Sequence, residues 1–255
     1  MGDLAYMMFM PFLFFYLFFL AYVFRKRKVE KILFAELDES EKDLEARDFF
    51  YNILKMERSA KSFYYLEVIF LIINTFFILF GGYKTYLEEV EFIKEFPSFS
   101  ISPLSSVLIK FMAPIIMWVL VFFLFIFAMI MKKKENKRIT EMLDNLEKVK
   151  HLKFAKEDFL RSDRILTTGV VSMSDIKLGD RYLFSVYPAY IIPYIYIQKI
   201  EVERFYRRGG SIYYLDIILK RSFQNIKIYF AKKDVAEKVR EFILERNKDL
   251  SKREY

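Results

Sequence analysis

Three long apolar stretches dominate the hydropathy pattern of this chain. They cover residues 4–24, 63–80 and 107–131 and contain few charged side chains. Each is close to the roughly 20 residues that a helix needs to cross the hydrocarbon core of a bilayer. We therefore predict that residues 1–131 form a membrane region with three transmembrane helices.

Basic residues flank the predicted spans on alternate sides and so predict a topology. Short loops rich in Lys and Arg stay in the cytoplasm. We expect the N-terminus and a loop over 81–106 outside, with residues 25–62 and the chain from 132 onward inside. The juxtamembrane basic residues, which we interpret as topology signals, are Arg25, Lys26, Arg27, Lys28, Lys132, Lys133 and Lys134.

The segments around the spans carry two further signals. A cleaved signal peptide has its positive charge before the apolar run, whereas here Asp3 precedes the first run and the basic cluster follows it. We therefore expect a retained anchor. The outside loop is expected to lack a folded domain and to turn at Gly81-Gly82, Pro97 and Pro103.

Two cytoplasmic segments beside the membrane show helical spacing of their apolar residues. The pattern over 26–62 predicts a hairpin of two helices with a break near Asp38. The pattern over 132–160 predicts a helical stalk, since Ile139 and Leu146 lie on a short apolar seam. We expect this stalk to pack against the hairpin.

From about residue 161 the pattern changes to short apolar runs separated by turn signals. Such runs predict an antiparallel meander of six or seven strands. The run over 190–206 is too long for one regular strand, and Pro193 cannot donate to a ladder, so a bend is expected there. An apolar stripe with helical spacing predicts a closing helix over 234–248.

The C-terminal pattern resembles the bacterial pleckstrin-homology-like (PH-like) domains of small membrane proteins. The resemblance covers residues 163–248 and rests on the segments TTGVV, LGDRYLFS, IIPYIYIQKIEVE and DVAEKVREFILE. It implies an open β-barrel plugged at one end by the final helix, acting as an interaction or assembly module. Lipid-binding members of the wider fold carry a basic loop after the first strand. Here that loop, 172–177, has one lysine and one aspartate, which disfavours phosphoinositide binding.

The predicted fold class combines these parts. It is an α-helical membrane protein with three transmembrane helices plus a C-terminal α+β PH-like open β-barrel, residues 161–255, capped by one helix.

No catalytic, metal or cofactor site is expected from the sequence. His151 is the single histidine and is interpreted as a surface or interface residue, and the chain has no cysteine to complete a zinc site. Phosphate-binding glycine motifs are absent from the sequence. Paired carboxylates occur at Glu88-Glu89, Glu157-Asp158 and Glu201/Glu203, and we interpret the last pair as part of a solvated strand edge. The expectation is a protein that is not an enzyme.

Two sets of residues are candidates for interactions. Residues 132–255 contain 28 Lys and Arg against 18 Asp and Glu. Some of these could form one surface for anionic lipid or an acidic protein segment, with a merely solvated surface as the alternative. The proposed members are Arg204, Arg207, Arg208, Lys220, Arg221 and Lys227. Within the second span, Asn74 and Thr75 are expected to form a helix–helix contact.

The sequence thus predicts a bacterial cell (inner) membrane protein, multi-pass, with a cytoplasmic C-terminal domain. The expected role is a scaffold or adaptor that contacts membrane lipids and a protein partner or a second copy, but not nucleic acid. Binding would use the basic face or an exposed strand edge. The alternative is a subunit of an oligomeric channel or transporter, suggested by Asn74, Thr75 and Pro114.

Overall fold

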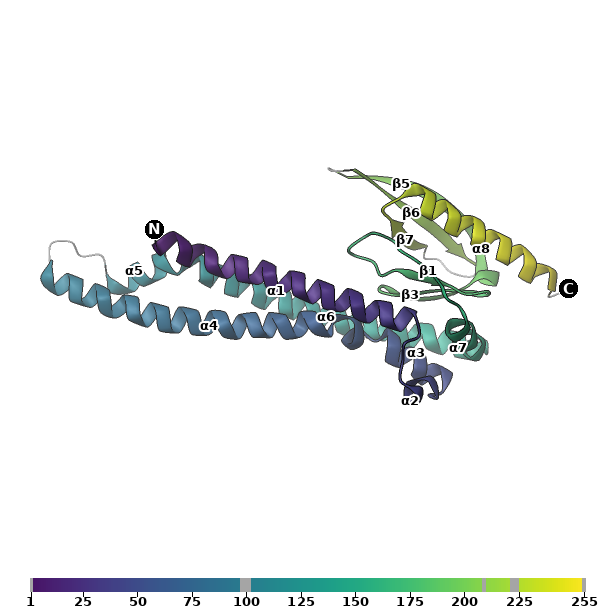
Figure 1. The fold of residues 1–255 in the computed structure, drawn as a ribbon, viewed down its shortest axis with the longest axis horizontal. Coiled ribbons are helices and arrows are strands. Elements are labelled where there is room, and N and C mark those ends of the chain that lie inside the picture. The colour runs from purple at the N-terminus through teal and green to yellow at the C-terminus, as the bar shows by residue number, and fades with distance from the viewer. Residues whose placement is uncertain (1, 97–101, 208–209, 221–224, 254–255) are drawn as a thin grey trace. The chain divides into compact units, whose positions relative to one another are not determined.

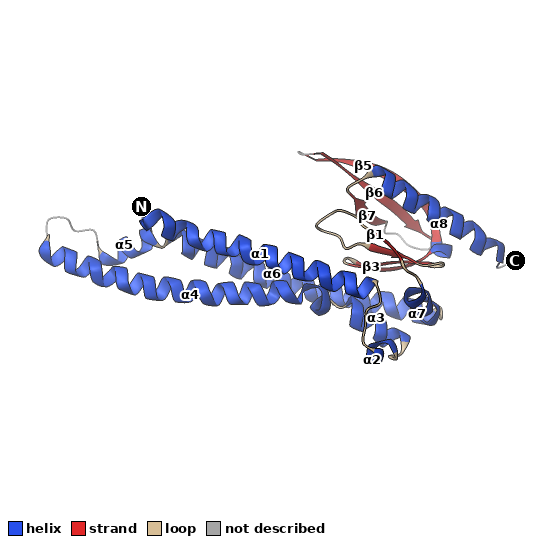
Figure 2. Cartoon of the chain, in the orientation of Figure 1, coloured by secondary structure: helices blue, strands red, loops and turns tan. Residues whose placement is uncertain are grey.

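The computed structural model describes residues 2–96, 102–207, 210–220 and 225–253 (Figure 1). Its internal contacts divide the chain into two units. The first contains Met1–Arg25 and Ala60–Lys134, and the second contains Lys26–Ser59 and Glu135–Tyr255. Helices make up the first unit, whereas the second combines helices with two sheets (Figure 2).

Three long helices enter the first unit, and each is long and apolar enough to cross a membrane. Their exposed faces carry large apolar side chains such as Phe12, Phe80 and Phe123, as expected where lipid and not water is the solvent. The buried contacts are few and centre on Met10 and Phe70. The three helices are α1 (Gly2–Leu33), α4 (Met56–Glu95) and α6 (Met112–Lys148), with the short α5 (Pro103–Lys110) before α6.

The predicted turn at Gly81-Gly82 is wrong, because both glycines lie inside α4, which continues to Glu95. A Cβ atom added at Gly81 would lie 2.6 Å from the ring of Phe111. Gly81 therefore allows close packing against that ring and does not end the helix. Much of the predicted outside loop is thus helical, while its Pro97 lies outside the described residues.

The helical part of the second unit is built from the ends of the long helices and three short ones. The predicted break near Asp38 is present, because α1 ends at Leu33 and Ala35 has a positive φ of 54°. The predicted stalk is not a separate element, since its first part continues α6 without interruption. The short helices are α2 (Glu39–Lys42), α3 (Ala46–Leu54) and α7 (Leu152–Arg161).

Two antiparallel sheets follow α7. The first has the order β1-β2-β3-β4 and the second the order β5-β6-β7. The bend predicted in 190–206 is present as a 3₁₀ turn, Tyr194–Tyr196, and a register shift between Ile197 and Lys199. The strands are β1 (Arg164–Leu166), β2 (Ile176–Leu178), β3 (Tyr182–Val186), β4 (Ala189–Pro193), β5 (Ile197–Arg207), β6 (Gly210–Leu219) and β7 (Ile226–Phe230).

The last helix, α8 (Lys233–Arg253), lies along the three-stranded sheet (Figure 1). Its apolar stripe, which includes Val239 and Ile243, packs on Leu215 and Ile217 of β6 in one buried cluster. Side chains of α8 also reach the edge of β5. Asn247 and Arg240 donate to the backbone oxygens of Ile197 and Ile200 at 3.1 and 3.2 Å.

A second buried cluster, here called the junction core, joins the first sheet to the helical ends. The cluster includes Leu33 of α1, Phe50 of α3, Leu143 of α6, Phe159 of α7 and Phe184 of β3. Phe184 lies 5.1 Å from the ring of Phe159 and 6.1 Å from that of Phe50, in edge and stacked geometries. The sheet is therefore packed directly onto the helix ends of the same unit.

Candidate functional site

Lys177 is a buried charged residue at the centre of the junction core. Its side chain is fully buried, and Nζ donates to the backbone oxygen of Leu33 at 2.6 Å. The same Nζ lies 4.3 Å from the centre of the Phe159 ring, a cation–π distance. Because the last carbonyls of a helix lack partners within the helix, this lysine caps the C-terminus of α1 from strand β2.

Burial lowers the pKa of Lys177 to about 8, although the carboxylates of Asp163 and Asp158 act in the opposite direction. Sequence analysis did not single out this lysine. The available signal was its position between Ile176 and Leu178 in a strand that is buried on both faces. That signal is visible only once the strand is known to lie between two packed layers.

A second set of polar contacts joins α6 to the turn between β3 and β4. Arg138 and Glu135 form an ion pair at 2.6 Å, and both bond to the backbone of Ala189. Arg138 also lies over the ring of Tyr190, 4.7 Å from its centre. These contacts connect the same two layers as Lys177 does.

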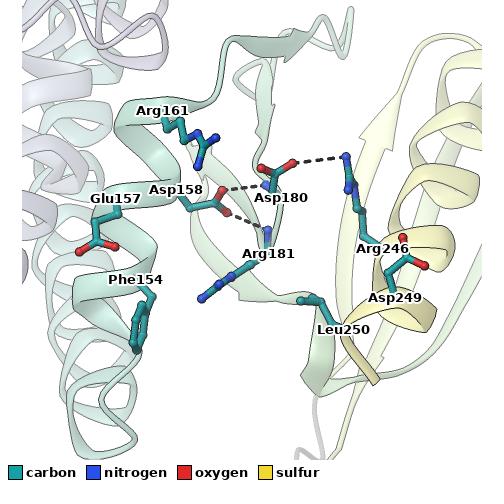
Figure 3. A pocket seen from close by; sticks show the side chains of 9 residues that line it. All are labelled: Phe154, Glu157, Asp158, Arg161, Asp180, Arg181, Arg246, Asp249 and Leu250. Atoms are coloured by element: carbon teal, nitrogen blue, oxygen red, sulfur yellow. Dashed lines mark hydrogen bonds and ion pairs between the residues drawn. The ribbon is translucent and has the colours of Figure 1, made fainter. Parts of the chain in front are cut away.

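Asp158 of α7 holds the turn between β2 and β3 (Figure 3). Its carboxylate accepts hydrogen bonds from the backbone N–H groups of Asp180, Arg181 and Tyr182 at 2.7, 2.9 and 3.0 Å. Burial raises the pKa of Asp158 against the opposing effect of these three donors. The neighbouring Gly179 makes the approach possible, because a Cβ there would lie 2.1 Å from Oδ2 of Asp158.

A cleft of about 360 Å³ lies beside this turn, between α7 and the C-terminal part of α8 (Figure 3). Arg246 of α8 reaches across to Asp180 at 3.3 Å. Glu157 also lines the cleft, whereas the carboxylate of its neighbour Asp158 is buried and accepts hydrogen bonds from the three N–H groups of the turn.

His151 lies between two tyrosines at the start of α7. Its Nδ1 is 2.7 Å from the hydroxyl of Tyr182, and its Nε2 is 3.1 Å from the hydroxyl of Tyr196. Both ring nitrogens are therefore used in contacts between α7, β3 and the 3₁₀ turn. Among the described residues, no group of three or more His, Cys, Asp or Glu side chains could hold a metal ion.

The structure does not bring the described members of the predicted basic set together on one face of the sheet. Arg204 pairs with Tyr213 and shares the core-side face with Ile200, whereas Lys227 pairs with Asp216 on the opposite face. Lys220 follows the end of β6, and Arg207 ends β5 at the other end of the hairpin, about 30 Å away for ten residues of strand. Arg208 and Arg221 lie outside the described residues.

The face of the three-stranded sheet turned away from α8, here called the outer face, carries tyrosines and both signs of charge. Tyr214 and Tyr229 lie with ring centres 5.5 Å apart, and Lys227 lies 4.7 Å from the ring centre of Tyr214. Glu201 pairs with Lys199 at 2.7 Å, and Glu203 accepts a hydrogen bond from Tyr214. The predicted solvated pair Glu201/Glu203 therefore belongs to this mixed surface.

The juxtamembrane basic residues make contacts typical of helix ends. Arg25 lies 5.7 Å from the ring centre of Phe63, and Lys132 lies 5.6 Å from that of Tyr64. Lys26 pairs with Glu30 at 3.8 Å on an exposed helix face. Long basic side chains beside aromatic rings suit the boundary between apolar and polar surroundings.

Asn74 and Thr75 form contacts between helices in the first unit. The Nδ2 group of Asn74 donates to the backbone oxygen of Pro114 at 2.9 Å. Thr75 accepts a hydrogen bond from Nε1 of Trp118 at 2.9 Å. These bonds join α4 to α6, as expected for a helix–helix contact, while Oδ1 of Asn74 is buried without a hydrogen-bond partner among the described residues.

We predict that Asn74→Leu lowers the stability of the helix bundle by roughly 0.6–2 kcal/mol, the usual range for one hydrogen bond between membrane helices. Resistance to unfolding by sodium dodecyl sulfate would measure this loss. Ile73→Leu, on an exposed face of the same helix, is the matched control and should have no effect. An unchanged stability together with a lost ion flux would contradict the structural role.

Comparison of the chain with known protein families, with curated proteins and with solved structures finds no match. Among the described residues, three helices are long and apolar enough to cross a membrane, which suggests a membrane protein.

Proposed function

We propose that the protein is a non-enzymatic membrane scaffold whose C-terminal domain binds a protein partner. The observation that carries this proposal is the junction core. Within the second unit, α1, α3, α6 and α7 all contribute buried residues to the cluster that holds β3 and β4. Such packing suits a module that presents a rigid surface to a partner.

The proposed location of the protein rests on the basic clusters that flank the apolar helices. The alternating basic clusters favour a cytoplasmic second unit and an N-terminus on the other side of a bacterial cell membrane. Two antiparallel sheets of four and three strands followed by one helix support the PH-like resemblance. The polar groups of His151, Asp158 and Glu203 form hydrogen bonds within the fold, which supports a binding role over catalysis.

The outer face is the surface that we assign to the partner. Tyrosines are enriched in protein interfaces because they combine a large apolar area with a polar group. The outer face offers Tyr214 and Tyr229 together with half-buried Ile212 and Ile218. The edge of β5 is less suitable near its start, because α8 already occupies the backbone oxygens of Ile197 and Ile200.

Photo-cross-linking in native membranes tests this proposal. A benzoylphenylalanine residue at Glu201 or Tyr214 should give a discrete protein adduct, identifiable by mass spectrometry. The same group at Glu241, on an exposed face of α8, serves as the control and should give none. Adducts of twice the chain mass would identify a second copy as the partner. The absence of a discrete adduct at both outer-face positions would overturn the proposal.

A further inference from the structure

The β5–β6 hairpin extends beyond the buried core of the second unit. The last well-buried side chain of the hairpin toward its free end is Leu215, which pairs with the half-buried Val202. Beyond this pair, the side chains of β5 from Glu203 to Tyr206 are exposed. We call residues 204–207 and 210–213 the hairpin end.

Large aromatic side chains are exposed on both faces of the hairpin end. Phe205 is 54% exposed and Tyr206 is 72% exposed. Neighbouring residues of a strand point to opposite faces, so no single docking surface on a flat partner would cover both. A soft apolar medium that surrounds this part of the hairpin would cover both side chains at once.

The charge of the hairpin end is of one sign. Between residues 204 and 215 the sequence contains arginines and no Asp or Glu. The guanidinium of Arg204 lies 4.3 Å from the ring centre of Tyr206, and its Nε donates to Ser211 at 2.7 Å. This arrangement places a positive charge directly beside an exposed aromatic ring.

We infer that the hairpin end is a lipid-contacting element for an anionic membrane surface. Phe205 and Tyr206 lie in the interface between head groups and acyl chains, where aromatic side chains are favoured. Arg204 binds the phosphate-bearing anionic head groups. One arginine near such a surface contributes roughly a fivefold increase in binding. The inference rests on the proposed function, because it requires the second unit to lie beside a bilayer.

The natural absence of cysteine makes the experiment direct. Phe205→Cys, Tyr206→Cys and the control Glu241→Cys are each labelled with an environment-sensitive fluorophore in the full chain. Each labelled protein is placed in nanodiscs of phosphatidylcholine, with or without phosphatidylglycerol. Lipids that carry a shallow nitroxide quencher report contact with the interface.

Quenching at positions 205 and 206, but not at 241, is expected in the anionic nanodiscs. The change Arg204→Gln should lower the ratio of lipid-bound to free hairpin by roughly fivefold. Lys238→Gln removes an exposed basic residue of α8 and should leave the ratio unchanged. Equal quenching at all three positions, or quenching that is independent of the anionic lipid, would overturn the inference.

Failure of the proposed function would look different. A chain that does not insert into nanodiscs contradicts the membrane anchor before any label is read. Because the nanodiscs contain no protein from the native membrane, the lipid result is independent of the cross-linking at the outer face. Unquenched labels in a chain that cross-links normally would refute the lipid contact alone.

Discussion

Replacing Gly179 by alanine is expected to destabilise the C-terminal domain by about 3 kcal/mol. A methyl group at this position would lie 2.1, 2.5 and 2.8 Å from Oδ2, Cγ and Oδ1 of Asp158. The carboxylate must then move away from the three N–H groups that it accepts. Hydrogen bonds to a charged group contribute about 1.5–3 kcal/mol each, so weakening two of them accounts for the loss. Urea-dependent proteolysis of the purified chain would measure it.

A double-mutant cycle separates this steric effect from a general effect of alanine. Asp158→Ala removes the carboxylate and should itself be strongly destabilising, because three buried N–H groups lose their acceptor. In that background, Gly179→Ala should cost less than about 1 kcal/mol, since the clash is gone. If Gly179→Ala lowers the stability equally in both backgrounds, the alanine methyl group does not act through a clash with the Asp158 carboxylate.

The stability of the domain is expected to rise with pH between about 7 and 9.5 because of Lys177. Its pKa is about 8 in the folded chain against 10.5 for a free side chain. Within this window the unfolded chain binds more protons than the folded chain, so a higher pH favours folding. The expected gain is about 2 kcal/mol.

Lys177→Met is the matched variant, because methionine fills a similar volume without a titrating group. Its stability should lack the rise, so the difference between the two proteins isolates the lysine. The window ends below about pH 10 because burial raises the pKa of Tyr190 and Tyr194, which destabilises the fold when unfolded tyrosines ionise. An identical pH dependence in both proteins would show that Nζ of Lys177 is solvated.

Local pattern was sufficient to predict most elements of this chain. The three spans, the break before Asp38, the strand meander and the final helix each depend on the spacing of neighbouring apolar residues or on turn residues. The double glycine at 81–82 misled the prediction, because a glycine serves a turn or a close helix contact equally well. Only the ring of Phe111, brought close by folding, decides between the two.

Some site residues could likewise be predicted from the sequence, and others could not. That Asn74 needs a partner follows from the cost of a polar group in a bilayer, so sequence alone was informative there. In contrast, the six basic residues were grouped by nearness in sequence, and strand register places Arg204 and Lys227 on opposite faces. Sequence determined which segments are helices and strands and which of them are apolar enough for a membrane. Tertiary structure alone decided that Lys177 caps α1 and that Asp158 holds a turn, because these contacts join residues 144 and 22–24 positions apart, and no local pattern encodes such a pairing.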